Sequence, residues 1–158
     1  MNEISEKKPL LARVKGAVLH RVRQWAKDLL LFRILPGEYR RAAKRPIQPG
    51  KVVFLENKEP AVPESFEVLY ERLSRVPELD VEFISLGETR VRLRQYYRNC
   101  IEAVRDLATA QCIFLNDASN VVSCLPLREG TKVVQLWHGC GAFKKWGMST
   151  ADLIFGGS

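Results

Sequence analysis

A histidine, several glycines and a pair of lysines follow the last apolar run of the chain. The run Lys132–Leu136 predicts a buried strand. The residues after it that can take part in chemistry are His138, Gly139, Gly141, Lys144 and Lys145. Ligands of open α/β sheets bind beyond the carboxyl ends of the strands. The order of residue types therefore predicts a functional site directly after this strand.

Each residue of this cluster has a chemical interpretation beside a structural one. The imidazole of His138 titrates near neutral pH and can act as a general base, although a lone histidine can also belong to an ordinary turn. Gly139 and Gly141 let the backbone approach a phosphate closely or turn without a Cβ clash. Lys144 and Lys145 can neutralise phosphate oxygens or form a solvated pair at a helix start, and the sequence favours neither.

A second, weaker candidate follows an earlier strand. Asn116 and Asp117 come directly after Gln111–Leu115, at another expected strand end. Side chains of this type commonly hydrogen-bond their own backbone in turns. We prefer that turn interpretation and retain the two residues only as weak site candidates.

The elements needed to position these residues alternate between strands and helices. Strands are expected at Lys51–Leu55, Val81–Leu86, Gln111–Leu115 and Thr131–Leu136, and helices at Glu64–Val76 and Arg90–Ala108. Such alternation is typical of a parallel sheet covered on both faces. We therefore expect an α/β fold with a Rossmann-like parallel sheet flanked by helices.

A basic segment precedes this alternation. Residues 1–45 contain 12 Lys and Arg against 4 Asp and Glu, although the net charge of the whole chain is only +7. Apolar residues at steps of three and four predict an amphipathic helix over Leu10–Leu35, which Pro36 and Gly37 are expected to end. We expect a helix lying on an anionic membrane surface first, a core helix second and a nucleic-acid arm third. The expected division is a membrane-associating segment at 1–45, a linker at 46–50 and a Rossmann-like domain at 51–158.

Composition and spacing argue against several other classes. A chain of 158 residues is long enough for one domain with a sizeable core. Its four cysteines form no C-x-x-C pair, so we expect no metal site, and no motif suggests a cofactor. No apolar run approaches the length of about 20 residues that a membrane span requires. The motifs of nucleic-acid modules are absent, and nucleic acid is not an expected partner.

Three stretches of the chain resemble one protein family. The uninterrupted string Gln135–Gly147 resembles the signature Q-L-W-H-G/A-x-G-A-F-K-K-F/W-G of the CDP-glycerol glycerophosphotransferase family, which contains teichoic acid primases and polymerases. Leu107–Asp117 is similar to the family's run L-A-T-A-K-Y-V-F-L-D-D, with Asn116 in place of the commoner Asp. Leu127–Lys132 is similar to its run L-R-K-G-T-K.

The resemblance implies a phosphotransferase. It implies that His138 deprotonates the acceptor hydroxyl, which attacks the β-phosphorus of CDP-glycerol or CDP-ribitol, with CMP as the leaving group. It further implies a lipid-linked polyol-phosphate acceptor and a peripheral location at the cytoplasmic face of the cell membrane, with residues 10–45 on the anionic inner leaflet.

The resemblance covers only the N-terminal, acceptor-side half of a GT-B-like two-domain architecture. We therefore expect a truncated domain that is inactive by itself. The alternative is a non-enzymatic membrane-surface binding module or a remnant of such a transferase.

Overall fold

A four-stranded parallel sheet forms the centre of the molecule. The structure, a computed structural model, describes residues 10–136. The strands are β1 (Lys51–Glu56), β2 (Asp80–Ser85), β3 (Cys112–Leu115) and β4 (Lys132–Gln135), in the order β2-β1-β3-β4. All neighbouring pairs are parallel, and Val53 of β1 is in register with both Glu82 and Ile113. The expected α/β fold with a parallel sheet is confirmed.

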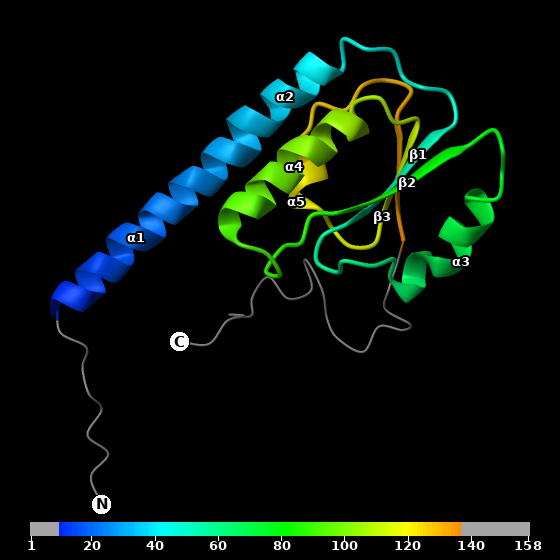
Figure 1. Ribbon diagram of the computed structural model, residues 1–158. Helices are drawn as coiled ribbons and strands as arrows, with labels where there is room; N and C mark the ends of the chain where they lie inside the picture. The colour runs from blue at the N-terminus through cyan, green and yellow to red at the C-terminus, as the bar shows by residue number, and fades with distance from the viewer. Residues whose placement is uncertain (1–9, 137–158) are drawn as a thin grey trace, which may run out of the picture.

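Helices cover both faces of this sheet (Figure 1). Helix α3 (Glu64–Leu73) connects β1 to β2, α4 (Leu93–Leu107) connects β2 to β3, and the short α5 (Asn120–Ser123) lies between β3 and β4. Helix α3 packs on one face, while α4 and the long N-terminal helix pack on the other. Because parallel strands need crossover connections, the helices occupy the two faces as layers.

An aromatic cluster fills the face below α3. Phe54 of β1 stacks on Phe114 with ring centroids 4.7 Å apart, and it meets Phe66 and Tyr70 of α3 edge-on at 5.0 and 5.3 Å. Offset-stacked and edge-to-face arrangements are the favoured geometries for aromatic rings. These contacts fix α3 against the centre of the sheet.

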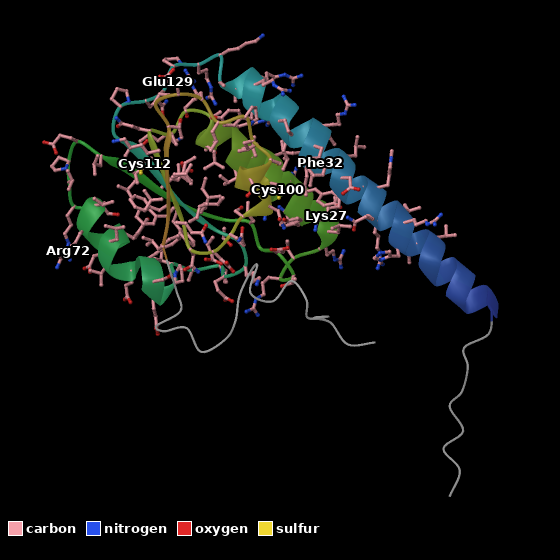
Figure 2. All side chains as sticks on the ribbon, turned by 180° about the vertical axis from the view of Figure 1, so that it is seen from behind. Lys27, Phe32, Arg72, Cys100, Cys112 and Glu129 are labelled. Atoms are coloured by element: carbon pink, nitrogen blue, oxygen red, sulfur yellow. The ribbon has the colours of Figure 1, made fainter. Side chains whose placement is uncertain are left out.

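The opposite face carries the larger core. Leu35, Tyr39, Val104 and Leu107 are at most 1% exposed and pack in one cluster with Val53 of β1. Figure 2 shows the side chains that fill this layer, with Cys100 of α4 on the side of the long helix. The second half of the N-terminal helix is therefore part of the core of the domain.

The N-terminal helix is longer than its sequence predicts. Helix α1 (Leu10–Leu29) continues through a π-helical turn, η1 (Leu30–Ile34), into α2 (Leu35–Ala42). The expectation that Pro36 and Gly37 end the helix is wrong. A proline ring clashes with the carbonyl group four residues earlier in a regular α-helix. Here a π turn, in which the Leu35 N–H donates to the Leu30 carbonyl, widens the helix directly before Pro36.

The last strand also differs from its expectation. The run Lys132–Leu136 predicts a buried strand, yet all four residues of β4 are exposed, with Val133 and Val134 at 38% and 37%. Strand β4 lies at the edge of the sheet, where β3 is its only neighbour among residues 10–136. The apolar pattern identifies the strand but not its position in the sheet.

Candidate functional site

The carboxyl ends of the four strands meet at one edge of the sheet. The parallel register places Glu56 opposite Ser85 and Leu55 opposite Leu115, and Leu115 lies opposite Gln135. The Leu136 amide continues this pairing by donating to the Leu115 carbonyl at 2.8 Å. This edge is where an open α/β sheet binds its ligands.

The main predicted site residues follow β4 but lie outside the described residues. They are His138, Gly139, Gly141, Lys144 and Lys145. The described chain ends at Leu136, on the carboxyl edge of the sheet. Their roles therefore stay predictions.

Asn116 connects three elements at this edge. Its Nδ2 donates to Glu56 Oε2 at 2.7 Å, and its Oδ1 accepts a hydrogen bond from the Ser65 hydroxyl at the start of α3. The amide donates to one partner and accepts from the other, which a carboxylate at the same position cannot do. The Asn116 side chain thus holds the ends of β1 and β3 to the first turn of α3.

Glu56, which is not among the residues predicted for the site, is a buried carboxylate. It is the last residue of β1 and is 4% exposed. Its Oε1 accepts the backbone amides of Lys58 at 2.9 Å and Glu59 at 3.4 Å. Buried charges persist in proteins when hydrogen bonds compensate for lost hydration. A charged residue directly after the apolar run Val52–Leu55 is the sequence signal that identifies this position.

Asp117 makes a local contact instead. Its Oδ1 accepts the amide of the next residue, Ala118, at 2.7 Å. The Asn57 side chain donates to the Ala118 carbonyl at 3.1 Å and links this turn to the loop after β1. These contacts are turn contacts, of the kind expected for Asn and Asp after a strand.

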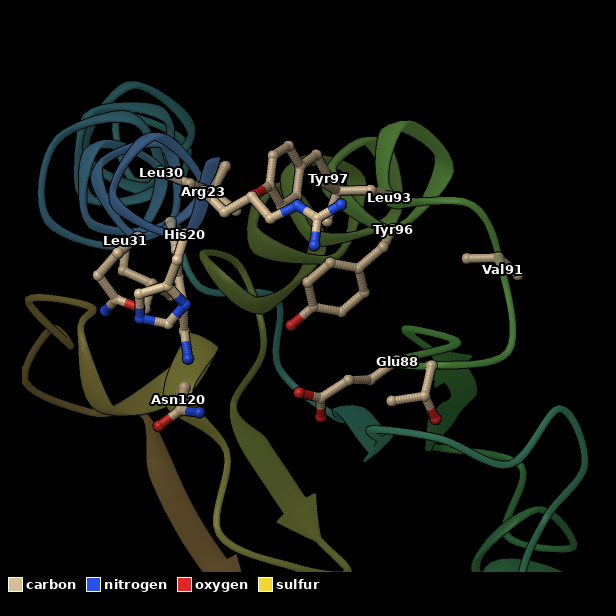
Figure 3. A pocket seen from close by; sticks show the side chains of 13 residues that line it. His20, Arg23, Leu30, Leu31, Glu88, Val91, Leu93, Tyr96, Tyr97 and Asn120 are labelled. Atoms are coloured by element: carbon tan, nitrogen blue, oxygen red, sulfur yellow. The ribbon is translucent and has the colours of Figure 1, made fainter. Parts of the chain in front are cut away.

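A cavity of about 410 Å³ opens at the same edge, on the side of the long helix. Its walls come from α1 and η1, the loop after β2, the first turns of α4 and the start of α5 (Figure 3). Cavities of about 300 to 1,000 Å³ are the usual size for small-molecule sites. The cavity could not be predicted from the sequence, because three stretches that lie far apart in the chain form it.

The three described thiols, Cys100, Cys112 and Cys124, have no sign of chemical activation. Burial raises the pKa of the Cys100 thiol to about 11, and burial also raises the pKa values of Cys112 and Cys124. A raised pKa keeps a thiol protonated and unreactive near neutral pH. Within residues 10–136 no group of three His, Cys, Asp or Glu side chains is placed to hold a metal ion. None of the described helices is long and apolar enough to cross a membrane.

A parallel α/β domain of this class binds its ligands beyond the carboxyl ends of its strands, and the fold by itself does not define the reaction. The family model described as CDP-glycerol:poly(glycerophosphate) glycerophosphotransferase matches residues 38–154. This match extends from α2 past β4, and the chain belongs to this family.

Three curated relatives support the same assignment. The chain is 32% identical over 135 residues to a teichoic acid ribitol-phosphate primase of Bacillus spizizenii, covering 81% of this chain and 35% of the relative. It is 32% identical over 113 residues to a teichoic acid poly(ribitol-phosphate) polymerase of the same organism, covering 72% of this chain and 18% of the relative. A teichoic acid ribitol-phosphate polymerase of Staphylococcus aureus is 24% identical over 99 residues, covering 62% of this chain and 19% of the relative. The chain thus spans about a third of the primase and about a fifth of each polymerase.

Proposed function

We propose that this chain supplies the acceptor side of an alditol-phosphate transferase of teichoic acid biosynthesis. The reaction transfers glycerol phosphate or ribitol phosphate from the CDP-alditol to a lipid-linked polyol-phosphate acceptor. The observation that carries this proposal is the family match over residues 38–154, which includes the sheet and the predicted site. The three relatives described above are ribitol-phosphate transferases, so CDP-ribitol is the first donor to test.

His138 is the general base in this proposal. It accepts the proton of the acceptor hydroxyl while that oxygen forms a bond to the β-phosphorus of the donor. The bond from this phosphorus to the oxygen of CMP breaks, and CMP leaves with the electron pair. Gly139 and Gly141 let the backbone approach the phosphates, and Lys144 and Lys145 offset their charge. The position of β4, which ends at the carboxyl edge three residues before His138, supports this assignment.

The exposed stripe of the long helix supports attachment to a membrane surface. It is defined as the outward apolar residues of α1 and η1, which are Val18, Val22, Trp25, Leu29 and Phe32. These side chains are 37% to 66% exposed. An interfacial helix buries such a stripe at the acyl boundary, while each nearby Lys or Arg contributes about 1 kcal/mol on an anionic surface. We propose peripheral attachment at the cytoplasmic face, with no separate role in nucleic-acid binding.

Residues 1–158 by themselves are not expected to turn over a CDP-alditol. They span only 35% of the primase that they resemble. Phosphoryl transfer depends on groups positioned around both reacting parts. A GT-B-like second domain would contact the nucleotide in this proposal.

A chimaera tests the proposal. Residues 1–154 of this chain would replace the matched region of the Bacillus spizizenii primase, and CMP release from CDP-ribitol would be measured with a lipid-linked acceptor. General bases contribute about 100-fold to 10,000-fold, so His138→Ala should lower the rate by at least about 100-fold. Arg72→Ala is the control, because Arg72 is an exposed residue of α3 that lines neither the cavity nor the predicted site. An unchanged rate for His138→Ala would contradict the base assignment.

A non-enzymatic membrane-surface module or remnant is the second candidate. The exposed stripe favours it independently of any catalytic residue. A folded chimaera that releases no CMP, combined with vesicle binding by residues 1–158, would favour this candidate over the enzyme.

A further inference from the structure

The cavity on the side of the long helix has a largely apolar lining, which includes Leu30, Leu31, Val91 and Leu93, with different polar groups on two opposite sides. Residues His20, Arg23 and Lys27 lie on one side of α1 and line the cavity together with the amide of Gln24. Their spacing of three and four residues places them on one helical face. Figure 3 shows Arg23 reaching across the cavity toward α4. This wall offers several N–H donors and positive charge.

Within residues 10–136, Arg23 and Lys27 have no protein counter-ion within reach. In the part of the chain that the structure describes, none of His20, Arg23 and Lys27 forms an ion pair within 4.0 Å. Some other cations of the domain are paired, such as Arg105 with Glu38 at 2.9 Å and Arg90 with Glu59 at 2.7 Å. The α1 wall therefore favours an anionic group from a ligand.

The opposite wall carries neutral and acidic oxygen atoms. Glu88 comes from the loop after β2, Tyr96 from α4 and Asn120 from the start of α5. Figure 3 shows the Tyr96 hydroxyl directed toward Glu88, with Asn120 near His20. Burial raises the pKa of Tyr96, so its hydroxyl stays a hydrogen-bond donor. A carboxylate here disfavours a second anionic group but accepts hydrogen bonds from ligand hydroxyls.

We propose that this cavity binds a phosphorylated polyol. The phosphate lies against His20, Arg23 and Lys27, while the polyol hydroxyls contact Glu88, Tyr96 and Asn120. The proposal deepens the transferase function and rests on it, because the cavity would hold the growing end of the acceptor beyond the carboxyl ends of β2 and β3. The cavity volume of about 410 Å³ accommodates one such unit.

Titration calorimetry of residues 1–158 with ribitol 5-phosphate tests the site, with inorganic phosphate and free ribitol as reference probes. We expect the alditol phosphate to bind at least tenfold more tightly than inorganic phosphate, and free ribitol to bind more weakly than either. The double variant Arg23→Gln/Lys27→Gln should lose at least tenfold in affinity. Equal binding of inorganic phosphate and alditol phosphate would overturn the proposal.

A matched control separates binding in the cavity from binding to the total positive charge of the helix. Arg21 and Arg33 are exposed cations of the same long helix that do not line the cavity. The double variant Arg21→Gln/Arg33→Gln should change the affinity by less than twofold. An equal loss in both double variants would overturn the site, because the binding would then follow the total charge of the helix.

Glu88→Gln examines the opposite wall. We expect this variant to weaken binding of the alditol phosphate at least threefold and to leave inorganic phosphate unchanged or slightly tighter. A parallel gain for both ligands would contradict the hydroxyl contacts. A competition experiment between glycerol 3-phosphate and vesicles of phosphatidylglycerol distinguishes a soluble from a lipid-borne source of the phosphate ligand. Displacement of either ligand by the other supports the site.

The test of the cavity can fail or succeed independently of the test of the transferase proposal. Cavity variants placed in the active chimaera should raise the acceptor KM by at least fivefold with a smaller effect on kcat. An unchanged KM would overturn the subsite while leaving the transferase proposal intact. Loss of alditol-phosphate binding in the Arg23→Gln/Lys27→Gln variant would support the site even if the chimaera were inactive.

Discussion

The two halves of the long N-terminal helix use the same amphipathic pattern in opposite ways. In the first half, Trp25 is 65% exposed, and Phe32 at its end is 66% exposed. In the second half, Leu35 and Tyr39 are 0% and 1% exposed and belong to the core. Figure 1 shows α1 extending beyond the body of the domain, whereas α2 lies against α4. One continuous helix therefore begins as a projecting arm and ends as a core element.

The π turn between the halves gives a physical reason for this change. On the side that faces the domain, the first half presents His20, Arg23 and Lys27 to the cavity. After the turn, that side presents Leu35 and Tyr39 to the core. A π turn contains more residues per turn than an α-helix and so rotates the residues that follow. Without the π turn, the apolar residues of the second half would continue the exposed stripe of the first half and would not face the sheet.

The largest expected effect compares two leucines on either side of this turn. Leu35→Ala removes a fully buried side chain and should lower the free energy of unfolding by about 2 to 5 kcal/mol. Leu29→Ala makes the same change at a position that is 37% exposed and should cost less than about 1 kcal/mol. Urea denaturation followed by circular dichroism measures both values. Similar losses for the two variants would contradict the division into an exposed and a buried half.

The exposed half should matter for membrane binding. Trp25→Ser/Phe32→Ser should weaken binding to anionic vesicles at least tenfold, because burial of each large apolar side chain contributes about 1.5 to 3 kcal/mol. Val68→Ser is the control, since Val68 is an equally exposed apolar residue, 63% exposed, on α3. Flotation assays at fixed lipid concentration give the affinities. If both variants bound alike, the stripe would not be the membrane-contacting surface.

The pH dependence of stability tests whether the buried half of the helix keeps solvent away from Cys100. The pKa of Cys100 is raised from 9.0 in the unfolded reference to about 11 by burial against this layer. The folded state then favours the protonated thiol, so this contribution to the free energy of unfolding is fully present below pH 9 and is lost as the pH rises toward 11. The free energy of unfolding is expected to fall by about 1 kcal/mol per pH unit in this range. Cys100→Ala should reduce this slope in denaturation series between pH 8 and 10.5, and an unchanged slope would show that other groups cause it.

The smallest expected effect concerns one hydrogen bond of the buried half. The Tyr39 hydroxyl accepts the Arg128 amide at 3.3 Å and joins α2 to the loop before β4. Tyr39→Phe keeps the ring but leaves that amide without this acceptor, at a cost of about 1 kcal/mol. Tyr70→Phe on α3 is the matched control. Thermal unfolding at one scan rate suffices, and a larger loss in the control would argue against the role of this contact.

Local patterns predicted most of the fold. The expected strand Lys51–Leu55 is found as β1, which is one residue longer, and the helix expected to begin at Glu64 begins there. Both were predictable because strand and helix periodicities are local properties of the sequence. The expected helix Arg90–Ala108 is shorter in the structure, where α4 begins at Leu93. Burial of β4 was predicted wrongly because exposure depends on which strands and helices become neighbours.

The candidate site was only partly accessible to sequence reasoning. Asn116 was singled out by its position after a strand, but its bonds to Glu56 and Ser65 join residues 51 or more positions apart. The cavity likewise combines His20 with Glu88 and Asn120. No local spacing encodes such distant neighbours.

The sequence by itself determined the alternation of strands and helices, the amphipathic character of the N-terminal segment and the resemblance that leads to the family. These features depend on residue order over short distances. The tertiary structure decided that Pro36 lies inside a continuous helix, that β4 is exposed at the edge of the sheet formed by residues 10–136 and that the cations of α1 face a cavity. Each of these outcomes depends on packing between segments far apart in the chain, which sets the face that every element buries.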